Sequence, residues 1–145
     1  MFVVDTNILI YATDRRSPFH DGCRVSLERW RRQTGPWYLT WGIVYEYLRV
    51  VTHPRVLARP LSLAQAWSFI DSLLASPGME VLLPTIRHVD VLRQIVHELP
   101  QLSGNIMHDA ETATLMHEHG IKVIISRDVH FHRFPFLERR DPIDS

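Results

Sequence analysis

The sequence predicts an α/β fold in which a mainly parallel sheet is covered by helices on both faces. Short apolar runs, several of them β-branched, alternate along the chain with longer segments whose apolar residues recur at helical spacing. The short runs lack the polar alternation of half-exposed strands, as expected for strands that are buried on both faces. Strands that alternate with helices in this way are typical of a parallel sheet.

The expected elements have recognisable boundaries. Thr40 and Ser62 are expected N-caps, because their side-chain oxygens can accept a hydrogen bond from a free backbone N–H of the following helix. Gly120 is the expected C-terminal signal of the last helix. The tail from Pro135 either adds a short edge strand or simply packs on the fold. In chain order, the expected strands are residues 3–4, 37–39, 81–83 and 122–125, and the expected helices are residues 8–12, 18–33, 41–51, 63–76, 85–99 and 105–119.

Length and composition indicate one ordinary globular domain over residues 1–145. A chain of 145 residues can bury a substantial core without disulfides or metal ions. Hydrophobic residues make up 46% and charged residues 22%, and no segment approaches the length of a membrane span. The N-terminus lacks the pattern of a signal peptide, so a cytoplasmic location is expected.

Cysteine content and charge exclude some classes of site and leave others open. Cys23 is the only cysteine, which excludes an intramolecular disulfide and a cysteine metal cluster, and its expected role is that of a small buried hydrophobe. The 16 basic and 16 acidic residues neither favour nor exclude a polyanionic partner. The arginines within residues 29–32 either bind phosphate groups or form a solvated helix face. We expect Trp37, Trp41 and Trp67 to belong to the core rather than to stack on bases.

Four acidic residues lie where the expected fold can bring them together. Asp5 and Asp128 follow the first and last predicted strands, and ligand sites of parallel sheets form beyond the carboxyl ends of the strands. Glu46 and Asp109 flank the apolar faces of their helices, where a charge is costly unless it is paired or bound to metal. For each acid alone, helix capping or a solvent-exposed border position is an alternative explanation.

The composition of this group indicates the kind of ion that it could hold. Carboxylates without thiolate or histidine suit a hard cation, Mg²⁺ or Mn²⁺, rather than zinc. Such ions polarise phosphoryl oxygens and generate hydroxide from bound water. The four acids therefore predict the hydrolysis of phosphodiesters by a metal-activated water.

Four segments of the chain resemble PIN-domain ribonucleases, and specifically the VapC-like toxins of bacterial type II toxin-antitoxin systems. The opening Asp-Thr-Asn alone is a weak signal, but the four segments in this order are specific, and the likeness spans residue 3 to about residue 142. The segments are Asp5-Thr6-Asn7-Ile8-Leu9, residues 45–56, His108-Asp109-Ala110 and Ser126-Arg127-Asp128.

The resemblance implies a three-layer α/β/α fold and an endoribonuclease that cleaves RNA with Mg²⁺ or Mn²⁺ and thereby inhibits translation and growth. It also implies a homodimer and a VapB-like antitoxin partner that blocks the site. By the same resemblance, the catalytic and metal-binding acids are Asp5, Glu46, Asp109 and Asp128. The residues implied to orient these acids are Thr6, Asn7 and Ser126. Helix capping is an alternative explanation for Thr6 and Asn7.

One position departs from the family pattern. Many relatives have a further Asp, Gly or Asn two residues after the last acid, where this chain has His130. His130 and its neighbour His132 could bind metal, bind phosphate or do neither, which leaves the number of metal ions open. His108 is a candidate proton carrier only if its helix turns it toward the site, because adjacent helical residues point in different directions.

Two other functions are alternatives to a ribonuclease. The first is a PIN-like interaction module without catalytic activity, which could use the acid pocket structurally or to hold a partner's arginine. A protein that has lost its enzymatic activity is expected to have lost at least one of the four acids, but all four are present in this chain. Metal-dependent cleavage of RNA distinguishes this module from a nuclease. A phosphatase of the haloacid dehalogenase class also has an aspartate after its first strand, but it needs a second one two residues later, where this chain has Asn7.

Overall fold

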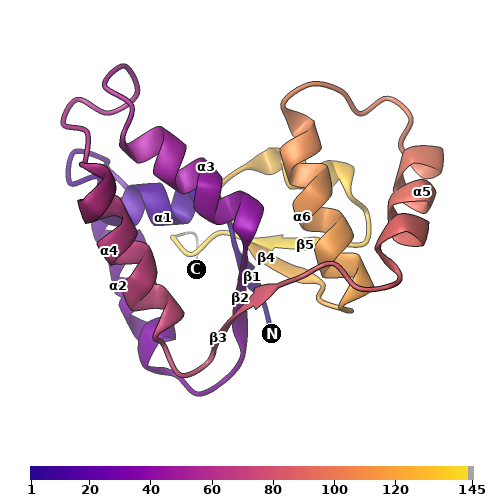
Figure 1. The fold of residues 1–145 in the computed structure, drawn as a ribbon, viewed down its shortest axis with the longest axis horizontal. Helices are drawn as coiled ribbons and strands as arrows, with labels where there is room; N and C mark the ends of the chain where they lie inside the picture. The colour runs from indigo at the N-terminus through magenta and orange to yellow at the C-terminus, as the bar shows by residue number, and fades with distance from the viewer. Residues whose placement is uncertain (144–145) are drawn as a thin grey trace.

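The computed structural model describes residues 1–143, and Figure 1 shows how its elements are arranged. The strands are β1 (Val3–Val4), β2 (Trp37–Thr40), β3 (Met79–Leu82), β4 (Val123–Ile125) and β5 (Glu138–Arg140). The helices are α1 (Thr6–Thr13), α2 (His20–Arg32), α3 (Trp41–Val51), α4 (Leu63–Leu74), α5 (His88–Glu98) and α6 (Ile106–Glu118), with a 3₁₀ helix, η1 (Val129–Arg133). Residues 144–145, the end of the expected domain, lie outside the described part of the chain.

The strands form one sheet in the order β3-β2-β1-β4-β5, and all neighbouring strands described are parallel. Val3 of β1 is aligned with Tyr38 of β2 on one side and with Ile124 of β4 on the other. The chain builds outward from β1 to β3 and then returns to place β4 and β5 on the opposite side of β1. The carboxyl ends of β1 and β4 therefore meet where the strand order switches, which is the usual place for a ligand site.

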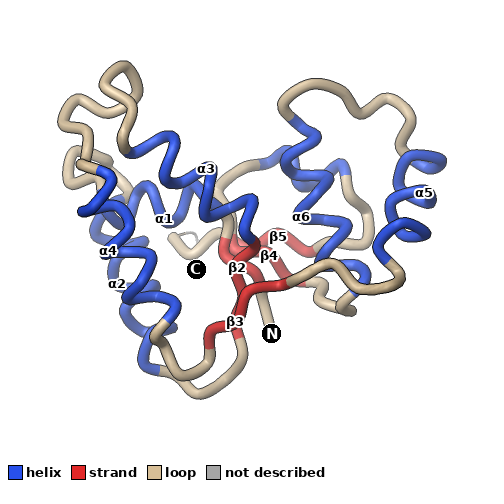
Figure 2. Tube along the Cα trace, viewed as in Figure 1, coloured by secondary structure: helices blue, strands red, loops and turns tan. Residues whose placement is uncertain are grey.

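Helices cover both faces of the sheet, so the predicted three-layer α/β/α architecture is confirmed. Figures 1 and 2 show α1, α2 and α4 on one side of the strands and α5 and α6 on the other, and α3 also contacts α6. Val3, Val4 and Ile124 are fully buried, as expected for apolar strands that are covered twice. Within residues 1–143, no helix combines the length and apolarity needed to cross a bilayer.

The boundary signals of the sequence are present in the structure. The Thr40 hydroxyl accepts a hydrogen bond from the backbone N–H of Ile43 at 3.1 Å and caps α3. Ser62 and Gln65 form a reciprocal capping box at the start of α4. Gly120 follows α6 with a φ of +70°, a conformation that glycine adopts without a steric penalty. Local sequence therefore determines where these helices begin and end.

Two predictions about burial are wrong. Trp41 and Trp67 are 41% and 42% exposed, whereas Trp37 is fully buried as expected. Trp41 is the first residue of α3 and lies outside its buried stripe, which Ile43, Val44, Tyr47 and Val51 form. The α4 helix buries only the narrow stripe made by Ala66, Ile70 and Leu73, and Trp67 lies outside it.

Some element boundaries also differ from the prediction. β3 begins at Met79, two residues before the expected start, and α5 begins at His88 rather than at Thr85. The Thr85 hydroxyl accepts a hydrogen bond from the backbone N–H of Arg87 at 3.1 Å, and its own N–H donates to Glu118, which holds residues 85–87 in a turn. The tail does add an edge strand, because β5 pairs with β4. Its charged side chains are typical of a protected sheet edge.

Candidate active site

A cleft of about 800 Å³ lies at the carboxyl ends of β1 and β4. Residues from the start of α1, from α3, from α6 and from η1 line it. The fold thus brings all four acids predicted from the sequence to one cleft, namely Asp5, Glu46, Asp109 and Asp128.

Asp5 is fixed by hydrogen bonds at the end of β1. Its backbone N–H donates to the Ile125 carbonyl at 3.0 Å, and its Oδ1 caps α1 by accepting from the Thr6 N–H at 2.8 Å. Its Oδ2 accepts from the Ser126 hydroxyl at 2.7 Å and from the Asn7 amide at 3.2 Å. The carboxylate is therefore oriented by donors from both β1 and β4 ends, and Thr6 contributes its backbone rather than its side chain.

Ser126 and Asn7 link Asp5 to the turn that carries Asp128. The Ser126 Oγ accepts from the Asp128 N–H at 2.9 Å and from the Asn7 amide at 3.1 Å. The Asn7 Oδ1 in turn accepts from the Arg127 N–H at 3.4 Å. Both residues therefore contact the acids that they were implied to orient, and they do so in addition to the capping made by Asp5 itself.

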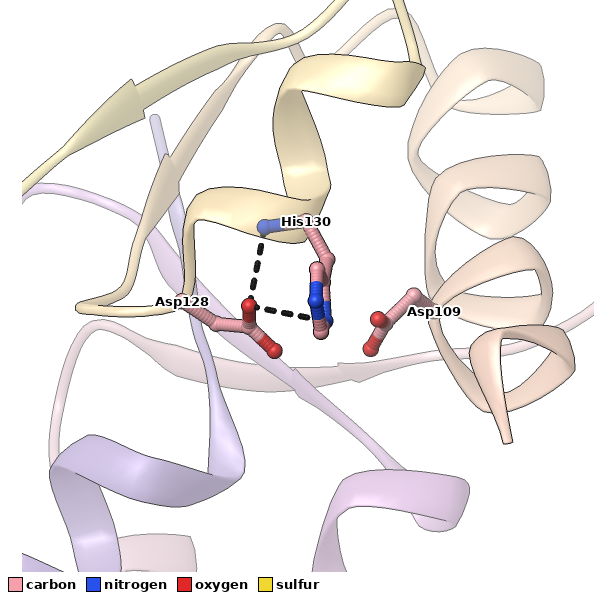
Figure 3. Close-up of side chains that lie close together, drawn as sticks. All are labelled: Asp109, Asp128 and His130. Atoms are coloured by element: carbon pink, nitrogen blue, oxygen red, sulfur yellow. Dashed lines mark hydrogen bonds and ion pairs between the residues drawn. The ribbon is translucent and has the colours of Figure 1, made fainter.

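Asp109, Asp128 and His130 form the tightest group of possible ligands, as Figure 3 shows. One ligand atom from each of the three lies within 4.8 Å of the other two. The Asp128 Oδ1 accepts from the His130 backbone N–H at 2.8 Å and lies 3.2 Å from the His130 Nδ1. Asp5 and Glu46 line the same cleft without belonging to this group.

The two acids on helices have different surroundings. Asp109, in the first turn of α6, has no hydrogen-bond or ion-pair partner for its carboxylate among residues 1–143. Glu46, on α3, is bound by the Arg49 guanidinium, with Nε to Oε2 at 3.0 Å and Nη2 to Oε1 at 2.6 Å. The spacing of three residues between Glu46 and Arg49 is a signal in the sequence that could have indicated this pair.

Burial and mutual repulsion raise the proton affinity of two of these acids. Burial raises the pKa of Asp109 to about 7, and the nearby charges of Asp5 and Asp128 add to the effect. Burial also raises the pKa of Asp5 to about 6, although hydrogen bonds from Ser126 and Thr6 oppose it. The hydrogen bond from Arg49 instead holds the pKa of Glu46 below its ordinary value.

The residues present fit a hard divalent cation. Asp5, Asp109 and Asp128 offer oxygen donors, and repulsion from Asp5 and Asp128 adds to the burial that raises the pKa of Asp109. A cation of charge +2 would remove this repulsion. The fit follows from the chemistry of the donors in the cleft.

Sequence reasoning missed two arginines of the cleft lining. Arg49 and Arg133 bring guanidinium groups to the same cleft as the acids, and the candidate proton carrier His108 also lines it. His108 is close enough to Glu46 for its charge to contribute to the lowered pKa of that carboxyl, so α6 does turn His108 toward the site. The position of Arg133 depends on how η1 folds back after Asp128, which no local pattern indicated.

Comparison with known proteins gives a consistent family. The PIN-domain family model matches residues 2–137. Ribonuclease VapC48 of Mycobacterium tuberculosis is 36% identical over 138 residues, covering 95% of this chain and 94% of that protein. Ribonuclease VapC43 of the same species is 35% identical over 144 residues, covering 99% and 97%.

Solved structures show the same fold at lower sequence identity. VapBC2 from Rickettsia felis, bound to a DNA fragment from its promoter, aligns with a TM-score of 0.70 at 18% identity and covers 97% of both chains. VapC20 of Mycobacterium tuberculosis, a toxin that cleaves the sarcin-ricin loop, aligns with a TM-score of 0.67 at 14% identity and covers 97% of this chain and 99% of that one. From the family model, the identities and the fold together, this chain belongs to the PIN-domain family, in its VapC-like group.

Proposed function

We propose that this chain is a metal-dependent endoribonuclease and the toxin of a toxin-antitoxin pair, with residues 1–145 forming one nuclease domain. The observation that carries the proposal is the meeting of four acids from separate segments in one cleft at the switch point of the sheet. The VapC ribonucleases that share 35–36% of their residues with this chain support RNA as the substrate. Inhibition of translation and growth is the expected cellular effect.

The proposed roles of the residues follow from their contacts. Asp5, Asp109 and Asp128 would hold the cation, Mg²⁺ or Mn²⁺, with Glu46 at the side of the cleft. A cation bound there supplies the charge that polarises phosphoryl oxygens and activates a water molecule. Ser126 and Asn7 keep the Asp5 carboxylate in one orientation, and their hydrogen bonds require no rearrangement when the substrate arrives.

The cationic side chains of the cleft have a separate proposed role. Arg133 is exposed and has no ion-pair partner among residues 1–143, and it lines the cleft beside the acids. A guanidinium binds phosphate with two hydrogen bonds, so Arg133 is placed to hold the RNA backbone. His108, exposed on α6, is placed to carry a proton.

Cleavage assays with defined RNA ends test the proposal. EDTA should abolish cleavage and added Mg²⁺ or Mn²⁺ should restore it. Products should carry a 5′-phosphate and a 3′-hydroxyl, because the proposed reaction uses water rather than the RNA 2′-hydroxyl as nucleophile. Asp109→Asn should lower the rate about 100-fold or more, whereas Asp71→Asn, the same change at an exposed position on α4, should leave it unchanged.

Three results would contradict the proposal in different ways. Cleavage that survives chelation would exclude the metal-dependent mechanism, and ends with a 2′,3′-cyclic phosphate would show attack by the 2′-hydroxyl. Absence of cleavage under all conditions, with intact folding, would instead favour the non-catalytic PIN module. Asp71→Asn controls for general effects of removing one negative charge.

The proposed partner is a VapB-like antitoxin, and the active form a homodimer. Support comes from the VapC relatives and from the VapBC assemblies that share the fold. A guanidinium from the antitoxin can replace the cation among the carboxylates, and Arg49 already binds Glu46 in this manner. Light scattering of the free protein tests the dimer. A solved complex tests the arginine, and inhibition that persists while Asp5, Asp109 and Asp128 stay open to solvent would exclude it.

A further inference from the structure

We propose that His130 is a nitrogen ligand of the cation in this cleft and that it shifts the cation preference from Mg²⁺ toward divalent transition ions, with Mn²⁺ as the test ion. The proposal deepens the proposed function and rests on it, because it concerns the same site. It assigns a role to a residue of the cleft other than the four acids.

The first argument is the direction of the side chain. Figure 3 shows the His130 ring between the carboxylates of Asp109 and Asp128. The His130 Nδ1 lies 3.2 Å from the Asp128 Oδ1, and one atom from each of the three residues lies within 4.8 Å of the others. Adjacent ligands of an octahedral ion with bonds of about 2.1 Å are about 3 Å apart, and opposite ligands about 4.2 Å apart. The separation of His130 Nδ1 and Asp128 Oδ1 matches that of adjacent ligands, and the 4.8 Å limit for the three residues brings Asp109 to within small side-chain movements of the same coordination sphere.

The second argument is that the backbone holds His130 in this place. The Asp128 carboxylate accepts a hydrogen bond from the His130 N–H at 2.8 Å and caps η1. Phe131 and Phe134 flank the turn and are 1% and 0% exposed, so the core fixes η1 on the opposite side. His132 provides an internal comparison, because it faces Arg139 at 3.4 Å and does not line the cleft. Of these two neighbouring histidines, the fold directs only His130 to the carboxylates.

The third argument is the chemistry of the donor. Mg²⁺ prefers oxygen ligands, whereas transition ions also accept imidazole nitrogen. A site of carboxylates and one imidazole should therefore discriminate against Mg²⁺ more than a site made only of oxygens does. Replacement of the imidazole by an amide should return the site to oxygen-only ligands.

An ion pair is the competing explanation for the same geometry. A protonated His130 could neutralise Asp128 in the free protein and move away when a cation binds. This alternative predicts that loss of the ring leaves Mn²⁺ affinity unchanged or increases it. The two explanations therefore predict opposite effects of one substitution.

Titration calorimetry of the metal-free protein with MnCl₂ and MgCl₂ measures the cation preference. His130→Ala should weaken Mn²⁺ binding about tenfold and Mg²⁺ binding by much less, and His130→Asn should raise the ratio of Mg²⁺ to Mn²⁺ affinity. His97→Ala, at an exposed position on α5, is the control and should match the wild type. Equal losses for both ions in His130→Ala, or tighter Mn²⁺ binding, would overturn the proposal.

Electron spin-echo envelope modulation of the Mn²⁺-loaded protein detects the nitrogen directly. The wild type should show modulation by a coordinated ¹⁴N, and His130→Ala should lose it. His108→Ala should keep it, which excludes the other histidine that lines the cleft. Mn²⁺ binding without ¹⁴N modulation would overturn the role of His130 alone. A wild type that binds neither ion, or an Asp109→Asn variant that binds them equally well, would instead overturn the metal site of the proposed function.

Discussion

The two sides of the cleft hold their acids in different ways. We call Asp5, Asn7, Ser126 and Asp128 the strand-end wall, because they follow β1 and β4, and we call Glu46 and Asp109 the helix wall. Hydrogen bonds connect every member of the strand-end wall to another member. No hydrogen bond or ion pair within residues 1–143 joins Glu46 to Asp109 or either of them to the strand-end wall.

Residues of the C-terminal segment also make hydrogen bonds and ion pairs with the turn that carries Ser126 and Asp128. The Arg139 guanidinium donates to the Ser126 carbonyl at 3.0 Å. Arg127 pairs with the nearly buried Asp141 at 2.8 Å and lies 3.9 Å above the centre of the Phe19 ring. The strand-end wall is therefore organised before any cation binds, whereas Asp109 depends on the helix backbone alone. Acids in the first wall should contribute to both stability and activity, and Asp109 to activity only.

The largest difference in the free energy of unfolding should appear between Asp5→Asn and Asp109→Asn. Both variants should lose about 100-fold or more in RNA cleavage. In EDTA, Asp5→Asn should also lose about 1–3 kcal/mol in the free energy of unfolding, because an amide N–H₂ would face the donors of Ser126 and Asn7. Asp109→Asn should unfold at the wild-type temperature or above it, since it removes a buried, unbonded charge that nearby carboxylates also repel. Thermal unfolding followed by circular dichroism measures both.

The free energy of unfolding of Asp128→Asn in EDTA should lie between those of Asp5→Asn and Asp109→Asn. The substitution removes one negative charge but also weakens the cap that Asp128 provides to η1.

Added Mg²⁺ should raise the wild-type melting temperature by mass action and raise that of Asp109→Asn much less. A melting temperature of Asp109→Asn as low as that of Asp5→Asn, with an equal response to Mg²⁺, would show that Asp109 is an ordinary structural acid.

Ser126→Ala should have the next largest effect on stability and on RNA cleavage. The substitution removes the donor to Asp5 and the acceptor for the Asp128 and Asn7 N–H groups, while it leaves every acid in place. We expect a loss of about 1–3 kcal/mol in stability and about 10–100-fold in activity. Ser68→Ala, at an exposed position on α4, is the matched control. Full activity of Ser126→Ala would show that the hydrogen bonds of the strand-end wall do not orient the acids.

The pH dependence of the free energy of unfolding should identify the carboxyls whose pKa is raised by burial. The folded-state pKa of Asp109 is about 7 and that of Asp5 about 6, both above the ordinary value of 3.8. Between about pH 4 and pH 7 the folded state thus binds protons that the unfolded chain has released, and the stability contributed by these groups falls as pH rises through that window. In EDTA, the difference in melting temperature between Asp109→Asn and the wild type should therefore grow from pH 5 to pH 8. A difference that stays constant over this range would contradict the raised pKa of Asp109.

In the wild type, saturating Mg²⁺ should oppose the fall in stability that occurs in EDTA as pH rises. Cation binding requires ionised carboxylates, so the metal stabilises the folded state more as pH rises. Melting curves at each pH with and without Mg²⁺ measure the effect. Asp109→Asn should show a much smaller response to the metal at every pH.

The smallest effect is expected for Arg49→Ala. Its pair with Glu46 is largely exposed, since the Arg49 side chain is 61% accessible, and such pairs contribute about 0.2–1 kcal/mol. The pKa of Glu46 should rise toward its ordinary value, because the hydrogen bond from Arg49 is the main cause of its lowering. Nuclear magnetic resonance titration of the Glu46 carboxyl measures that shift. A loss of stability as large as that of Ser126→Ala would show that the helix wall is also organised by its hydrogen bonds.

The sequence by itself determined the class of the fold, most helix ends and the identity of the acids in the cleft. These features depend on interactions over a few residues. Helical spacing defines an apolar stripe, the Thr40 and Ser62 side chains cap the helix that follows them, and Asp5 caps α1 directly after β1. Position after a buried strand was enough to predict that Asp5 and Asp128 lie at one edge, because parallel strands end on the same side of a sheet.

Only the tertiary structure decided which groups touch one another and how deeply they are buried. Trp41 and Trp67 have apolar side chains at plausible core positions, yet their exposure depends on how closely neighbouring elements approach. The group of Asp109, Asp128 and His130 brings η1 close to α6, and burial raises the pKa of Asp109. Such distances arise from the strand order and from helix packing, which are set by contacts across the whole core, whereas local patterns extend over only one or two turns.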